Sequence, residues 1–349
     1  MVAEDHDIEE NLSAYAVRFV SFAICILVAP LEAVAQAPAR VPIVGVLSPW
    51  SAPSPSDARP DRANEAFEQG LKELGWIPGR TIHIEYRYAE GRQGHLQELA
   101  RELVQLRVDV IVPRGTQLIQ AAKQATATIP IVMAGVGYDP VELGLVASLA
   151  QPGRNITGLT LLAQDLVAKQ LEFLKEVVPR LSTVAVLGRA SFPLPPKGRQ
   201  NLEAAAQALG VQLRHVEVQG PDDLDQAFAD MTRMHVSGLL VRPDPFVLES
   251  VQGRVVALAL RHKLPAIYWL PTYVQAGGLM SYGPNLPDVH RRSAYYVDRI
   301  LRGTPPADLP IEEPAKFALT VNLKTARTLG LTTPQSILTR ADDIIQPYQ

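Results

Sequence analysis

Few side chains in this sequence have the types and spacing that catalysis or metal binding requires. The seven histidines are scattered, with no pair four residues apart and no spacing typical of a zinc site. Neither a G-x-S-x-G nucleophile motif nor a phosphate-binding P-loop occurs, and the short pattern Gly135-Val136-Gly137 is too weak for a dinucleotide site. We therefore expect no catalytic residues, no metal, no cofactor and no enzymatic activity. The histidines are His6, His83, His95, His215, His235, His262 and His290.

Hydroxyl and carboxylate groups near the ends of predicted strands suit noncovalent binding of a small molecule instead. Ser48 and Thr116 each follow an apolar strand, so their hydroxyls could hold a ligand carboxylate. A simple helix cap explains Thr116 equally well. Asp244 stands between two prolines and could pair with a ligand ammonium group or cap a helix. For Asp139 we favour the cap, because the residues from 141 onward have a helical pattern.

Aromatic side chains also occur at or near these strand ends. Core packing explains each one singly, but as a group they predict a cleft that suits a flat or partly apolar ligand. Arg114 and Arg242 follow corresponding strands and could bind a carboxylate with two hydrogen bonds, or lie at a solvated rim. The ligand-binding candidates of this group are Trp50, Tyr138, Phe192, Phe246, Tyr268 and Tyr282, with the neighbouring hydroxyl of Ser281, while Trp269 shares their environment.

Short β-branched segments alternate with amphipathic helical stretches from residue 41 onward. Strands are predicted at 41–47, 81–87, 108–112 and 129–134, and helices at about 61–74, 95–106 and 117–126. This alternation predicts a parallel sheet covered by helices on both faces. The candidate side chains then lie at the carboxyl ends of the strands, which is where open α/β sheets bind ligands.

Three short patterns recur in the same order at a nearly constant offset. VGVLS at 44–48 corresponds to VAVLG at 184–188, an offset of 140 residues. The pairs LG at 74–75 and 209–210, and IPIV at 129–132 with LPAI at 264–267, are each offset by 135 residues. A repeat of this length predicts two similar α/β domains and not a solenoid, whose repeats are about 20–50 residues long.

The repeat predicts an α/β protein of two hinged, Rossmann-like lobes with parallel sheets. The N-terminal lobe comprises 41–157 with 275–303, the C-terminal lobe 158–274 with 312–349, and the ligand cleft lies between them. Pro152, Gly153 and Gly158 mark residues 150–162 as a turn-rich passage between the lobes. The tail, 316–349, is expected to contain one strand and two short helices.

Residues 1–35 have the three parts of a cleavable signal peptide. Arg18 precedes an apolar run at 19–31, and AVAQA at 33–37 supplies a cleavage site. The run is short for a membrane span, although an uncleaved anchor is the alternative. The single cysteine, Cys25, lies within this run, and residues 22–24 lack the small side chains expected before a lipidated cysteine. We therefore expect a periplasmic, freely soluble monomer without a thiol.

The charge distribution argues against nucleic-acid binding. The net charge is −3, and no basic run occurs that could follow a phosphate backbone. A small-molecule ligand is the expected partner.

Ten segments carry a resemblance to a known family: 44–49, 67–79, 84–91, 108–112, 121–126, 129–132, 144–150, 155–159, 277–285 and 322–326. Together they resemble the bacterial ABC-transporter substrate-binding protein family related to the tryptophan-binding type. The resemblance covers about residues 41–345 and implies two Rossmann-like lobes in the type I periplasmic-binding arrangement, which close on a ligand by hinge motion. It also implies ABC permease subunits as partners and an amino-acid-like or aromatic carboxylate ligand. A ligand sensor of the same fold is the alternative, and a hydrolase or isomerase is a third.

Overall fold

The computed structural model describes residues 40–53, 62–161, 163–190, 192–243, 251–314 and 316–346. Residues Val41–Gln349 belong to one compact unit. The expected signal peptide (1–35) and the site candidates Asp244 and Phe246 lie outside the described residues. In the described part of the chain, no helix combines the length and the apolar character that crossing a membrane requires.

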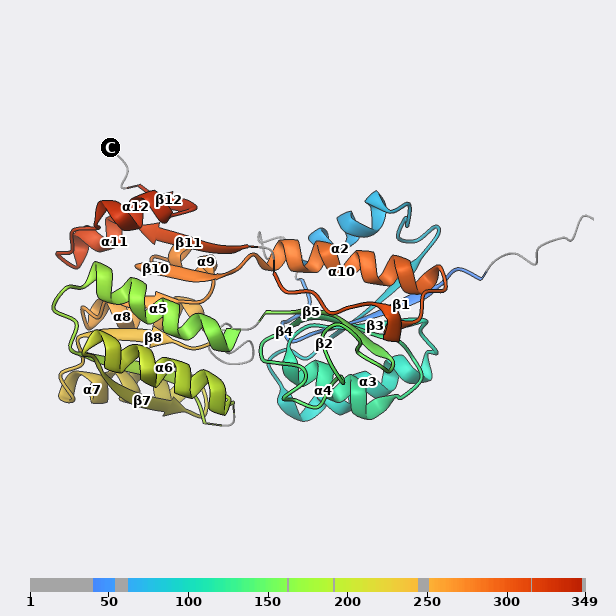
Figure 1. Cartoon of the computed structure of the whole chain (residues 1–349), viewed down its shortest axis with the longest axis horizontal. Coiled ribbons are helices and arrows are strands. Elements are labelled where there is room, and N and C mark those ends of the chain that lie inside the picture. Colours follow the sequence, from blue (N-terminus) through green and yellow to red (C-terminus); the bar gives the residue numbers. More distant parts are fainter. Residues whose placement is uncertain are drawn as a thin grey trace, which may run out of the picture. The chain divides into compact units, whose positions relative to one another are not determined.

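The first sheet has five parallel strands in the order β2-β1-β3-β4-β5. Helices cover both of its faces, α2 and α10 on one and α3 and α4 on the other, so most of its strands are apolar throughout (Figure 1). The strands are β1 (Ile43–Ser48), β2 (His83–Tyr88), β3 (Val110–Pro113), β4 (Ile131–Val136) and β5 (Ile156–Thr160). The helices are α2 (Arg62–Glu73), α3 (Leu96–Gln105), α4 (Thr116–Ala125) and α10 (Leu286–Leu301).

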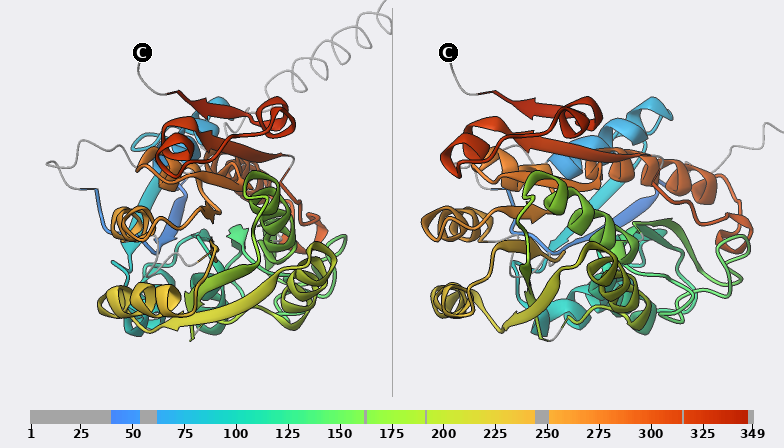
Figure 2. Two further views of the ribbon diagram at one scale, coloured as in Figure 1. Left: turned by 90° about the vertical axis from the view of Figure 1, so that its left-hand side faces the viewer. Right: turned by 60° about the vertical axis from the view of Figure 1, so that its left-hand side comes forward.

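The second sheet has seven strands in the order β12-β11-β10-β9-β8-β6-β7, and only the β10–β11 pair is antiparallel. Figure 2 shows α5 and α6 on one side of this sheet and α7 and α8 on the other. The strands are β6 (Thr183–Arg189), β7 (Gln212–Val218), β8 (Gly238–Val241), β9 (Ala266–Tyr268), β10 (Met280–Pro284), β11 (Phe317–Asn322) and β12 (Asp343–Ile345). The helices are α5 (Ala163–Val177), α6 (Pro196–Leu209), α7 (Leu224–Arg233), α8 (Gln252–Arg261), α9 (Pro271–Gln275), α11 (Leu323–Thr328) and α12 (Gln335–Arg340).

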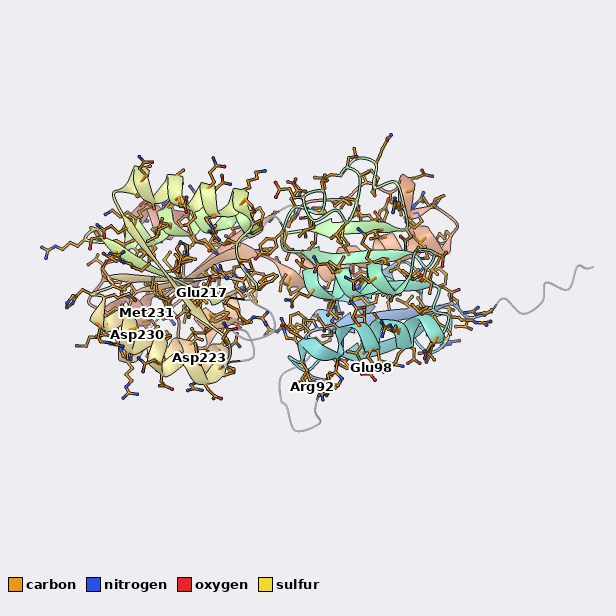
Figure 3. All side chains as sticks on the ribbon, turned by 90° about the horizontal axis from the view of Figure 1, so that it is seen from below. Arg92, Glu98, Glu217, Asp223, Asp230 and Met231 are labelled. Atoms are coloured by element: carbon orange, nitrogen blue, oxygen red, sulfur yellow. The ribbon has the colours of Figure 1, made fainter. Side chains whose placement is uncertain are left out.

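The outer helices are amphipathic, as the helical spacing of their apolar residues predicts. On α7, Asp230 lies at the surface, while the adjacent Met231 is completely buried (Figure 3). Glu98 on α3 is likewise exposed. The two mostly parallel, helix-covered sheets confirm the predicted α/β fold class.

Two details of the chain path differ from the sequence-based expectation. The passage at 150–162 contains the strand β5, which pairs with β4. Gly158 has a φ of +123° there, and this glycine within a strand was interpreted as a turn signal. The tail contains a second strand, β12, which pairs with β11.

Along the residues that the structure describes, the chain crosses between elements of the two sheets three times. It passes from β5 to α5, from β10 to α10, and from Glu312, which bridges to Leu159, to β11. Segment 275–303, expected with the first lobe, is divided by the structure: β10 pairs in the second sheet, whereas α10 packs on the first. Residues 158–160, expected with the second lobe, belong to β5 in the first sheet.

Contacts with α2 fix the position of α10. Gly70 allows the close approach, because a Cβ atom there would lie 2.5 Å from the carbonyl oxygen of Arg291. Beyond the end of α2, Trp76 Nε1 donates a 2.8 Å hydrogen bond to the buried carboxylate of Asp298. These contacts place the N-terminal half of α10 beside the carboxyl ends of the first sheet's strands.

Candidate functional site

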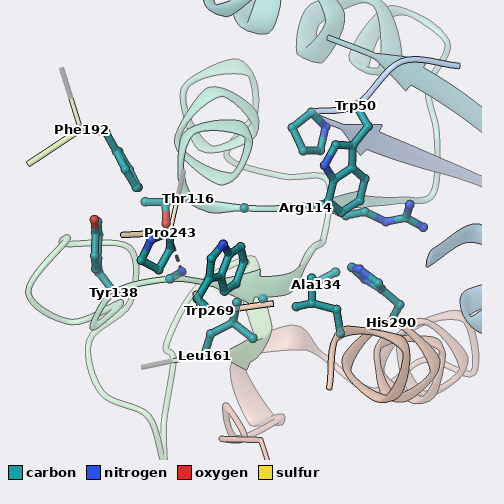
Figure 4. A pocket seen from close by; sticks show the side chains of 15 residues that line it. Trp50, Arg114, Thr116, Ala134, Tyr138, Leu161, Phe192, Pro243, Trp269 and His290 are labelled. Atoms are coloured by element: carbon teal, nitrogen blue, oxygen red, sulfur yellow. Dashed lines mark hydrogen bonds between the residues drawn. The ribbon is translucent and has the colours of Figure 1, made fainter. Parts of the chain in front are cut away.

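A hollow of about 570 Å³, partly open to solvent, lies where the carboxyl ends of strands from both sheets meet (Figure 4). Most of its residues follow β1, β3, β4, β5, β6, β8 or β9, as expected for an α/β protein. Four predicted site residues line it: Trp50, Thr116, Tyr138 and Phe192. The other lining residues are Pro49, Arg114, Gly115, Ala134, Gly135, Gly137, Leu161, Pro243, Trp269, Leu286 and His290.

Thr116 joins two of the loops that form this hollow. It is the first residue of α4, and it follows Gly115, whose φ of +85° favours glycine. The buried Thr116 Oγ1 accepts a 3.1 Å hydrogen bond from the backbone N–H of Gly137, after β4. The hydroxyl hydrogen can still be donated to a ligand.

Arg114 brings a positive charge into the wall of the hollow. The residue is only 2% exposed, so the alternative of a solvated rim position is wrong. Its Nη1 donates a 2.7 Å hydrogen bond to the side-chain oxygen of Asn64. The Asn64 Nδ2 in turn donates to the Tyr88 hydroxyl at 2.9 Å. These two hydrogen bonds connect the guanidinium group to α2 and, through Asn64, to β2.

Arg242, the corresponding arginine of the second sheet, holds a loop. Its Nη2 donates to the backbone oxygens of Arg189 at 3.1 Å and Phe192 at 2.7 Å. The Arg242 side chain packs directly on Gly188. A Cβ atom at this position would lie 2.1 Å from the Arg242 Nε, so a larger residue would displace the guanidinium group. Arg242 thus positions Phe192 at the hollow.

The aromatic rings of Tyr138 and Phe192 meet across the hollow, although they follow strands of different sheets. Their ring centroids are 5.1 Å apart. The Tyr138 hydroxyl donates to the backbone oxygen of Pro193 at 3.4 Å. Because Tyr138 is 7% exposed, most of its ring is removed from solvent. The pair forms an apolar wall to which both sheets contribute.

Trp269, which follows β9, lies between these rings and α10 in Figure 4. Its backbone packs closely against Gly283 of β10. A Cβ atom at Gly283 would lie only 1.8 Å from the Trp269 carbonyl oxygen, so a residue with a side chain would not fit there. The side chain is 5% exposed, and its Nε1 has no hydrogen-bond partner among the described residues. This N–H is therefore a candidate donor to a ligand.

His290 is a lining residue that the sequence patterns did not single out. It lies on α10, is 2% exposed, and packs edge-on against Trp50 with ring centroids 6.3 Å apart. Neither ring nitrogen has a hydrogen-bond partner among the described residues. Burial, and secondly the charge of Arg114, hold the pKa of His290 well below its ordinary value. The available signal was a histidine at helical spacing with the apolar residues Ala294 and Val297.

Protonation of His290 is expected to make stability depend on pH. Above its ordinary pKa of 6.5 the imidazole is neutral in both the folded and the unfolded chain, so it contributes nothing to the pH dependence. Below pH 6.5 only the unfolded chain takes up the proton, so the free energy of unfolding falls, by up to about 1.4 kcal/mol per pH unit until the folded-state pKa is reached. Urea unfolding between pH 6.5 and 5 measures this effect. In His290→Phe the free energy of unfolding should fall less over this range than in wild type. The control His95→Gln, at an exposed histidine, should show the same fall as wild type. Equal slopes for wild type and His290→Phe would contradict the assignment.

Of the other predicted site residues that the structure describes, none is among those that line the hollow. Ser48 Oγ accepts from the backbone N–H of Trp50 at 3.4 Å. Asp139 caps a turn by accepting from Val141 N at 2.8 Å. The expectation of a helix from 141 onward is wrong, because residues 140–144 form turns and Gly144 has a φ of +63°. Tyr268 stacks on Tyr273 with centroids 4.7 Å apart.

Both candidates on β10 also lie apart from the hollow. Ser281 is buried in this strand, and Tyr282 packs against Phe173 with ring centroids 4.9 Å apart. The described residues contain no group of three or more His, Cys, Asp or Glu side chains that could hold a metal ion.

A family model described as ABC transporter substrate binding protein matches residues 45–345. The chain belongs to this family. A "Tyrosine-binding protein" of Clostridioides difficile (strain R20291) is 26% identical over 272 residues, which are 78% of this chain and 77% of that protein. These findings confirm the family expected from the sequence, and the protein is a solute-binding protein.

Two solved structures support the same conclusion. A conserved domain protein from Vibrio cholerae is 27% identical, with a TM-score of 0.79, over 87% of this chain and 100% of that one. An ABC domain in complex with L-Trp from Streptococcus pneumonia is 26% identical, with a TM-score of 0.78, over 87% of this chain and 99% of that one.

Proposed function

We propose that this protein captures an aromatic amino acid, or a closely similar aromatic carboxylate, and delivers it to the membrane permease of an ABC importer. The observation that carries the proposal is that aromatic rings and the buried charge of Arg114 line the same hollow. Tyr138, Phe192 and Trp269 would contact a flat ring, and the guanidinium group would favour an anionic group on the ligand. The tyrosine and tryptophan ligands in the names of the two relatives support this class.

Binding is proposed to close the protein. The lining residues come from both sheets, so a ligand in the hollow would contact both and stabilise their approach. The three connections near Leu161, Pro284 and Glu312 would serve as the hinge. We further propose that the protein is exported by its signal peptide and acts as a periplasmic monomer.

A ligand screen tests the proposal. The protein beginning at Gln36 is unfolded and refolded to remove carried ligand, then titrated with L-tryptophan, L-tyrosine, L-phenylalanine and L-leucine while its unfolding midpoint is recorded. A ligand at a hundredfold excess over its Kd stabilises the protein by about 2.7 kcal/mol, so at least one aromatic amino acid should raise the midpoint clearly.

Matched variants locate the binding site. Phe192→Ala should weaken the response, whereas Phe317→Ala, which removes a ring on β11 that is not among the lining residues, should not. A response to leucine alone, or consumption of the bound compound, would overturn the proposal.

A further inference from the structure

The imidazole of His290 presents buried polar atoms to the ligand hollow. The side chain is 2% exposed, lines the hollow, and has no hydrogen-bond partner for Nδ1 or Nε2 among the described residues. Figure 4 shows it extending from α10 toward the part of the hollow that contains Ala134, Trp50 and Arg114. Buried polar groups in folded proteins are nearly always hydrogen-bonded, so an imidazole in this position has the capacity to bind a ligand.

The neighbourhood of His290 suits an acceptor group with a negative charge. Arg114 is near enough for its charge to lower the pKa of His290. The imidazole is therefore neutral, with one N–H donor. A ligand ammonium group beside Arg114 would be repelled, whereas a carboxylate would accept the imidazole N–H and balance the guanidinium charge. Trp269 Nε1 adds a further buried donor to the same hollow.

We propose that His290 donates a hydrogen bond to the carboxylate of the bound ligand, next to Arg114. This assignment rests on the proposed function, and it fixes which end of an aromatic amino acid lies against α10. The ring then extends toward Tyr138 and Phe192, which lie on the other side of Trp269 in Figure 4. His290 is thereby a specificity-determining residue that distinguishes acids from their neutral analogues.

The test compares each aromatic amino acid with its amide, which has nearly the same shape but lacks the carboxylate. L-Tryptophan, L-tyrosine, L-phenylalanine and the amide of each are titrated separately into the protein beginning at Gln36, and binding is measured by calorimetry. Wild type should bind the best acid roughly a hundredfold or more tighter than its amide, because charge-assisted hydrogen bonds are the strong ones. In His290→Phe the affinity for the acid should fall roughly tenfold or more, while the affinity for the amide changes less than about threefold. His290→Gln, which keeps an N–H donor, should retain much of the preference.

Tyr296→Phe is the matched control. Tyr296 lies on the same helix, and its hydroxyl donates to the backbone oxygen of Pro310 at 2.8 Å, outside the lining of the hollow. Its removal should leave the ratio of acid to amide affinity unchanged. An equal effect of Tyr296→Phe and His290→Phe would show a general disturbance of α10 and would overturn the role of His290.

The outcomes separate this inference from the proposed function. If no aromatic amino acid binds to wild type, the proposed function has failed, and this inference with it. If they bind and His290→Phe keeps the wild-type ratio, only the role of His290 is overturned. Should His290→Phe not fold, the imidazole signals of ¹⁵N-histidine-labelled wild type, assigned with His290→Gln, supply the answer. They should shift on saturation with the acid, and less with the amide, whose oxygen is a weaker acceptor. The absence of a shift with the acid, or equal shifts with both, would overturn the role.

Discussion

Arg114→Met is expected to lower the affinity for an aromatic amino acid by roughly 30- to 1,000-fold, or about 2–4 kcal/mol. The guanidinium group is buried in the wall of the hollow, where a charge interacts more strongly than in water. The ligand carboxylate would lose this compensating charge and remain partly desolvated. Calorimetric titration of the variant with the best aromatic ligand measures the effect.

The same substitution should change the stability of the free protein much less. Loss of the hydrogen bond leaves the Asn64 oxygen without its donor, which costs about 1–3 kcal/mol. Removing a buried charge in favour of an apolar side chain of similar length offsets part of this loss. Arg92→Met is the control, because the Arg92 side chain is 59% exposed. It should change neither the ligand affinity nor the free energy of unfolding. Unchanged ligand affinity in Arg114→Met would contradict the electrostatic role of this residue.

The alternation of apolar segments predicted four strands of the first sheet well but not the edge strand β5. Predicted strands and helices begin within about two residues of the observed ones, because buried parallel strands need continuous apolar runs. β5 was interpreted as a turn, since Gly158 and the pair Pro152-Gly153 are local turn signals. Its strand conformation depends on pairing with β4, which is a tertiary contact.

The strand-end rule placed four of its candidates at the hollow but could not supply the contribution of α10. His290 reaches the hollow because Gly70 and the bond between Trp76 and Asp298 hold α10 against α2. These partners are far apart in sequence, and no local pattern reveals their contact. The rule also could not distinguish Tyr268 from Trp269, because a three-residue strand gives no reliable indication of which side chain faces the ligand.

Arg242 illustrates a third limit of the sequence. Its place after β8 made it an equal candidate with Arg114 for a ligand carboxylate. The structure instead directs its guanidinium group to backbone oxygens of the loop after β6. Residue type and position relative to a strand are the same for both arginines, and only the surrounding backbone acceptors separate their roles.

Gly158→Ala is expected to lower the free energy of unfolding by about 3–5 kcal/mol, a large share of the roughly 5–15 kcal/mol that stabilises a typical domain. The residue has a φ of +123°, where a side chain strains the backbone. A Cβ atom would also lie 2.4 Å from the oxygen and 2.6 Å from the nitrogen of Met133 on β4. Both atoms belong to the backbone of a central strand, so they cannot move aside as a flexible side chain would. Urea unfolding, followed by circular dichroism, measures the loss.

Gly210→Ala separates the two causes of this loss. Gly210 has a φ of +64°, but a Cβ atom there would meet no atom within 4 Å, so only the backbone strain of about 1–2 kcal/mol remains. The difference between the two variants measures the close approach of β5 to β4. Because β5 leads directly to Leu161 in the wall of the hollow, Gly158→Ala should also weaken ligand binding, whereas Gly210→Ala should not. If both variants lost the same stability, the approach of the two strands would be loose, and Leu161 would not be held rigidly at the site.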